Sequence, residues 1–143
     1  MSYQNSSSAR DAQFQNLVQN IGSNIQRIQQ NATTIKVMTK CQHEFRLKVY
    51  LQKLTSQIGS SVRHHGAQLQ QQLHQLNQLT GQLARDSGEQ LHQLSSFLED
   101  GAGDCRRWRL QRDTLQGEFK KALGSFQVAQ REAAEKEREN IRY

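Results

Sequence analysis

The chain has 143 residues, a length that favours one domain, and it contains no proline, the strongest breaker of helices. Aromatic residues make up 6% and strand-like alternation is scarce, so the composition predicts an all-α fold and disfavours a sheet protein. The net charge of +6 raises nucleic acid or an anionic membrane as partners, but the basic residues are spread along the chain, which favours an ordinary solvated surface.

The first predicted helix spans about residues 10–58, after a polar segment of residues 1–9 that we expect to be a disordered tail. Its apolar residues recur at spacings of four and three, which places them on one helical face. They are Phe14, Val18, Ile21, Ile25, Ile28, Ala32 and Ile35.

This apolar stripe breaks after Ile35. Continuing it would reach Thr39, Gln42, Arg46 and Val49, whereas the next apolar residues are Leu47, Leu51, Leu54 and Ile58. One straight helix cannot turn both sets toward the same core.

Two further helices are predicted downstream. Glycines bracket residues 59–66, which favours a loop there, and a second helix follows at about 67–98. A turn at residues 99–104 leads to a third helix at about 104–140. Its apolar face consists of Leu115, Phe119, Ala122, Phe126, Ala129 and Ala133.

Amphipathic helices joined by short polar connections must pack antiparallel. We therefore predict that residues 10–143 form one domain, an up-down-up three-helix bundle with a long or kinked first helix. The side chains expected in its core are Phe14, Ile21, Ile25, Ile28, Leu69, Leu73, Leu115, Phe119 and Phe126.

No catalytic, cofactor or metal site is expected. The histidines and the two cysteines lack the spacing of metal ligands, and no arrangement of a nucleophile with a base is evident. The arginines around Trp108 could contact nucleic acid, but Trp108 lies seven residues before Leu115 on the same face. Packing inside the bundle is therefore the favoured interpretation, and we expect neither nucleic-acid binding nor a transmembrane segment.

The second helix carries a candidate partner groove. Thr80, Ser87 and Gln90 interrupt its leucine stripe, and a closed core would disfavour these polar side chains. An amphipathic helix could lie there as a fourth member of the bundle. The alternative is that the polar residues face water at a loosely packed end. The candidate groove comprises Leu76, Thr80, Leu83, Ser87, Gln90 and Leu94.

Three segments of the chain resemble one known family. They are SNIQRIQQNATTI (residues 23–35), QLQQQLHQLNQLTGQLA (68–84) and RLQRDTLQGEFKKALGSFQVAQREAAEKE (109–137). In this order they resemble the N-terminal three-helix (Habc) domain of a syntaxin, a Qa-type SNARE, and most closely the endosomal branch.

The resemblance implies a non-catalytic regulatory and interaction domain in vesicle docking and membrane fusion. The implied partners are the SNARE helix of a syntaxin and Sec1/Munc18-like or other trafficking factors. The implied location is the cytoplasmic face of endosomal membranes, with this chain alone soluble, cytosolic and monomeric. Family members continue into a SNARE segment and a membrane anchor, whereas this chain ends at Tyr143, so an excised domain or a truncated product is expected.

The chain also departs from the family at residues 36–51. Ile35 and Leu51 fit the same family position, so the sixteen residues Lys36–Leu51 are extra. Sixteen residues at about 100° each rotate the helical face by roughly 160°, which explains the break after Ile35. We expect a continuous but overlong or kinked helix, whose residues 45–58 extend past the bundle or pack poorly.

Two other functions stay open on the sequence alone. One is a generic helical scaffold that self-associates through its leucine and glutamine stripes. The other is a basic bundle that binds nucleic acid, which would weaken steeply as salt is raised.

Overall fold

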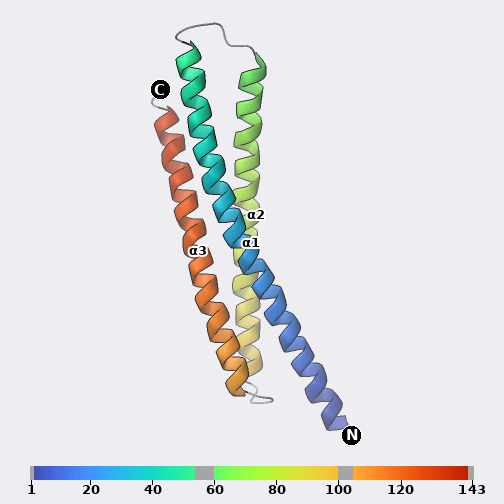
Figure 1. Cartoon of the computed structure of the whole chain (residues 1–143). Coiled ribbons are helices and arrows are strands. Elements are labelled where there is room, and N and C mark those ends of the chain that lie inside the picture. The colour runs from blue at the N-terminus through green and yellow to red at the C-terminus, as the bar shows by residue number, and fades with distance from the viewer. Residues whose placement is uncertain (1, 54–59, 100–104, 142–143) are drawn as a thin grey trace.

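In the computed structural model, residues 2–53, 60–99 and 105–141 are described, and they form three α-helices. Helix α1 spans Ser2–Lys53, α2 spans Ser60–Glu99 and α3 spans Cys105–Ile141. The helices alternate in direction, and α1 passes across α2 so that its N-terminal end projects away from the other two helices (Figure 1). No strand occurs within the described ranges. The predicted all-α three-helix bundle with a long first helix is confirmed.

Two helices begin earlier than the apolar pattern indicates. Helix α1 starts at Ser2 and includes most of the segment expected as a tail, and α2 starts at Ser60 instead of about residue 67. Polar residues without proline are compatible with helix, so a missing apolar pattern does not end one. The expected end of the first helix at Ile58 lies outside the described residues, and the division of the chain into a tail and one domain stays a prediction.

Gly66 illustrates why the expected loop was misplaced. A Cβ atom added at Gly66 would lie 3.4 Å from Cε1 of Phe45. This glycine therefore lies where α2 approaches α1, inside a helix, whereas its sequence context indicated the end of a loop.

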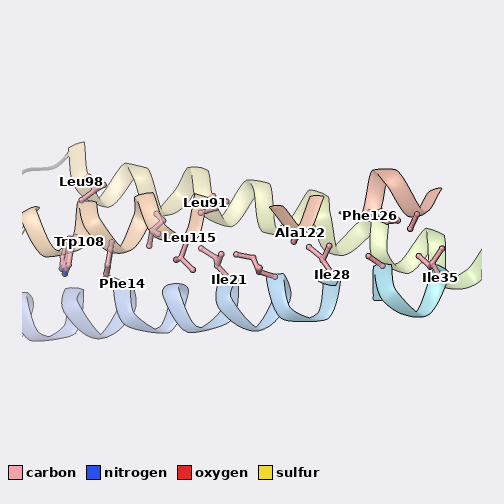
Figure 2. Packing of buried hydrophobic residues seen from close by; sticks show 14 of the residues in the cluster. Phe14, Ile21, Ile28, Ile35, Leu91, Leu98, Trp108, Leu115, Ala122 and Phe126 are labelled. Carbon is pink, nitrogen blue, oxygen red and sulfur yellow. The ribbon is translucent and has the colours of Figure 1, made fainter. Parts of the chain in front are cut away.

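The core is a row of side chains along the axis of the bundle (Figure 2). On α1, the buried residues Phe14, Ile21, Ile28 and Ile35 recur every seven residues, which is close to two helical turns. They face buried residues of the other two helices. Those partners are Leu73, Leu91, Leu94, Leu98, Trp108, Leu115, Ala122, Phe126 and Ala129.

The side chains expected in the core differ in burial. Phe119 is half-buried and packs against the cluster, whereas Leu69 is half-buried and lies outside it. The others are buried: Phe14, Ile21, Ile25, Ile28, Leu73, Leu115 and Phe126.

An aromatic cluster closes the end of the bundle near the connection from α2 to α3. The rings of Phe14 and Trp108 stack with centroids 4.2 Å apart and planes inclined by 9°. Phe97 meets both rings edge to face, at 6.0 Å from Phe14 and 6.4 Å from Trp108. The indole Nε1 donates a hydrogen bond to Oδ1 of Asp11 at 3.3 Å. One residue from each helix thus fixes their relative register at this end.

The extra block, Lys36–Leu51, continues α1 as regular helix. Its inward side holds the residues on which the first stripe would continue, with Thr39 and Gln42 buried and Arg46 and Val49 half-buried. The helix therefore keeps its geometric phase, and four apolar residues of the block turn outward, while Met38, Phe45 and Val49 are half-buried. Those left exposed are Val37, Leu47, Tyr50 and Leu51.

Candidate functional site

The three helices line a polar cleft of about 510 Å³ beside the extra block. Helix α1 contributes residues that all belong to this block, so the cleft exists where the helical phase brings polar side chains inward. The principal polar residues around it are Thr39, Gln42, His43, Arg46, Gln70, His74, Asn77, Lys136 and Glu137.

Gln70 joins all three helices across this cleft. Its Oε1 accepts a hydrogen bond from Nε2 of Gln42 at 2.9 Å and a second from Nη2 of Arg46. Its Nε2 donates to Oε1 of Glu137 on α3 at 2.9 Å. The side-chain amide of Gln70 thus accepts a hydrogen bond from the buried Gln42 of α1 and connects it to the carboxylate of Glu137 on α3. At this level of the bundle, polar contacts replace part of the apolar packing.

Two buried atoms in the cleft have no hydrogen-bond partner in the described structure, Nδ1 of His43 and Oδ1 of Asn77. Both residues line the cleft. A buried polar atom without a partner is destabilising by about 1–3 kcal/mol, so these two atoms favour water in the cleft. The cleft can therefore hold polar groups.

Within the candidate partner groove, three of the six residues are inaccessible to a partner. Thr80, Ser87 and Leu94 are fully buried. The hydroxyl of Thr80 donates to the carbonyl of Leu76, and that of Ser87 to the carbonyl of Leu83, each at 2.7 Å. Helical Ser and Thr can satisfy themselves in this way, so their presence does not require an open face.

The other three groove residues keep some accessible surface. Gln90 is half-buried, and its Oε1 accepts a hydrogen bond from Nδ2 of Asn24 on α1 at 3.1 Å. Leu76 and Leu83 are half-buried at the edge of the core. Leu79 lies between them at helical spacing and is 58% exposed. Leu79 is not among the six residues predicted for the groove, because apolar spacing alone does not distinguish an exposed leucine at the edge of a stripe from a buried one.

In the cluster of arginines at the start of α3, the tryptophan is not accessible to a ligand. Trp108 is 2% exposed, while Arg106, Arg107 and Arg109 are exposed around it. The indole is stacked on Phe14 and is therefore not available to stack on a base.

A metal centre and a membrane span are two other kinds of site that the described residues could form. Among these residues, no group of three or more His, Cys, Asp or Glu side chains is placed to hold a metal ion. Of the helices in the described ranges, none has the length and apolar character needed to cross a membrane.

Comparison with known proteins places these observations in a family. A family model described as syntaxin-like protein matches residues 49–143. The chain is 34% identical to syntaxin-7 of Rattus norvegicus, of Pongo abelii and of Homo sapiens, over 125 residues in each case. These matches cover 87% of this chain and 41% of each relative, so the chain spans less than half the length of these proteins.

No solved structure matches the chain significantly. The resemblance seen in the three sequence segments is nevertheless shown by the curated relatives and by the family model, which begins just before the end of the extra block. The chain belongs to the syntaxin-like protein family.

Proposed function

We propose that this chain is a non-catalytic regulatory domain of a syntaxin-like SNARE and acts in vesicle docking and membrane fusion in the endosomal system. The observation that carries the proposal is the similarity to syntaxin-7 over 87% of the chain, together with the three-helix architecture. The proposed place of action is the cytoplasmic face of endosomal membranes.

The proposed partner is the SNARE helix of a syntaxin. An amphipathic helix binds by laying its apolar face against apolar side chains spaced along a groove. On α2, the half-buried Leu76 and Leu83 and the exposed Leu79 form such a row on one flank of the core. We define Leu76, Leu79 and Leu83 as the leucine strip. Sec1/Munc18-like or other trafficking proteins are further proposed partners of the domain.

Chemical-shift mapping tests this proposal directly. The isotope-labelled chain is titrated with a peptide that carries the SNARE segment of human syntaxin-7, and the expected result is perturbation of backbone signals in residues 76–83. The variant Leu79→Asp should weaken binding, because it places a charge in the strip. A matched control is Leu110→Asp on α3, since Leu110 is 69% exposed and lies outside the strip. Unchanged signals in residues 76–83, or equal weakening by both variants, would contradict the assigned surface.

Nucleic-acid binding is less favoured by the structure than by the sequence. Stacking on bases requires an accessible aromatic face, and the face of Trp108 is covered by Phe14. A titration with random-sequence RNA at rising salt distinguishes this function, since phosphate contacts weaken steeply with salt.

A further inference from the structure

The outward face of α1 changes its chemistry at residue 36. Before this point its exposed residues are mostly uncharged and polar, with Asp11 and Arg27 as charged exceptions, and they include Gln26, Gln29, Gln30 and Thr33. Beyond it, exposed lysines alternate with exposed apolar side chains. At about 100° per residue, six of these fall within an arc of about 120°. They form the outer α1 patch: Lys36, Val37, Lys40, Leu47, Lys48 and Leu51.

The apolar members of the outer α1 patch are substantially exposed, with Val37 at 55%, Leu47 at 49% and Leu51 at 60%. Single exposed apolar residues are ordinary on protein surfaces, but a row of them on one face indicates an interaction site. Their outward position has a cause in the sequence. Because the helix keeps its phase through the extra block, the polar residues Thr39 and Gln42 occupy the core side.

The charge on this face indicates the kind of partner. Three lysines of the patch share the face with one acidic residue, Glu44, which gives a local charge of +2. A second copy of this chain docked on the same face would bring lysines near lysines, which is unfavourable. None of the six patch residues lines the polar cleft, so the patch belongs to the outer surface of α1.

We propose that the outer α1 patch binds the surface of an anionic lipid bilayer. Valine and leucine side chains enter the boundary between headgroups and acyl chains, while lysines extend their ammonium groups to the headgroup phosphates. The inward side of α1 holds the bundle together, so the helix can lie flat on the bilayer without unfolding. The proposal requires no SNARE partner and goes beyond the regulatory function proposed above.

Vesicle sedimentation of the full chain provides the first test. The chain should bind vesicles that contain phosphatidylserine and should bind phosphatidylcholine vesicles far less. A lysine near such a surface contributes about 1 kcal/mol, which corresponds to about a fivefold change in partitioning. The double variant Lys40→Gln with Lys48→Gln should therefore lower partitioning by about 25-fold. The matched control is Lys120→Gln with Lys121→Gln, two exposed lysines of α3, which should leave partitioning almost unchanged.

The exposed thiol of Cys41 borders the patch and gives an independent readout. With Cys105→Ser in the background, an environment-sensitive fluorophore on Cys41 should shift to the blue when phosphatidylserine vesicles are added. The variant Leu47→Gln should reduce this shift, whereas Leu110→Gln on α3 should not. Circular dichroism checks that each variant remains helical.

Several results would overturn the proposal. These are no binding to phosphatidylserine vesicles, equal binding to both vesicle types, or equal losses in the patch and control variants. Binding to a glutamate-rich helical peptide without binding to vesicles would assign the patch to an acidic protein instead. A fluorophore on Cys41 that does not respond to bound vesicles would place the membrane contact on another face.

Discussion

Phe126 is the largest fully packed side chain in the second half of α3, with 3% of its surface exposed. Replacing a buried Phe by Ala typically lowers the free energy of unfolding by about 3–5 kcal/mol, because it removes apolar contact and leaves a cavity. We expect this loss for Phe126→Ala in urea denaturation. Phe119→Ala should lower it less, since Phe119 is half-buried.

Val128→Ala serves as the control for this pair, because Val128 is 39% exposed and close to Phe126 in sequence. If Phe126→Ala left the denaturation midpoint at the value of the unmodified chain, the assignment of the apolar face of α3 would be wrong.

Gly124 gives a prediction of the opposite sign. It lies inside α3, and a Cβ atom added there would meet nothing within 4 Å. Alanine is favoured over glycine in a helix interior by about 1 kcal/mol, partly because it restricts the unfolded chain. Gly124→Ala should therefore raise the free energy of unfolding by up to about 1 kcal/mol, and Gly117→Ala, in equally open space, should do the same. A lower thermal midpoint in both variants would show that these positions are more crowded than the structure indicates.

At single residues, apolar spacing predicts burial well and polarity predicts exposure poorly. Phe14, Ile21 and Ile28 recur at helical spacing and are buried. Thr80 and Ser87 are also buried, because their hydroxyls are satisfied by carbonyls of their own helix. A sequence pattern does not reveal such local hydrogen bonds, so Thr80 and Ser87 do not by themselves indicate an open groove, and the groove stays a prediction.

Helix α1 packs differently in its two halves. Residues 21–35 bury isoleucine on the inward side, while residues 36–51 bury Thr39 and Gln42 and line a polar cleft. Helical stability in proteins comes mainly from packing of an apolar face, so the second half is the less stable. We expect amide hydrogens of residues 36–51 to exchange much faster than those of residues 21–35. Mass spectrometry after deuterium labelling measures both segments at once, and equal deep protection would contradict the expectation.

Deleting residues 36–51 tests the origin of this difference. In the shortened chain, Leu54 and Ile58 would follow Ile35 at spacings of three and four, which restores the apolar stripe. The thermal midpoint should rise, because polar residues no longer occupy the inward side. A lower midpoint would mean that the contacts of Gln42 and Arg46 with Gln70 stabilise the bundle more than an apolar continuation does.

The arrangement of elements could be predicted from the sequence to a large extent, and the packing of the extra block only in part. Lack of proline and three apolar stripes were sufficient for three antiparallel helices. The break in the apolar stripe after Ile35 could also be predicted from the sequence, and so could a first helix that continues through the extra block. Which of the two apolar sets would face the core could not be decided, because this depends on contacts from α2 and α3 such as Gln70 and Glu137.

At the scale of the whole molecule, the apolar faces of all three helices pack against one another inside the bundle. The stripe of α1 faces both other helices, and Phe14, Phe97 and Trp108 close one end. A helical scaffold that self-associates would need a further apolar face. Among the described residues, the leucine strip offers one exposed leucine, Leu79, and the larger candidate is the outer α1 patch, whose lysines oppose contact between two copies.

We therefore expect a monomer over a concentration series in analytical ultracentrifugation at moderate salt. The role of the lysines can be tested by raising the salt concentration, since the screening length falls from about 10 Å at 0.1 M to about 3 Å at 1 M. If lysine repulsion is what prevents pairing through Val37, Leu47 and Leu51, screening should allow weak association at 1 M salt. Leu47→Gln should abolish that association and Leu110→Gln should not. Self-association at low salt that weakens as salt rises would show instead that opposite charges join two copies, and the chain would then be a scaffold.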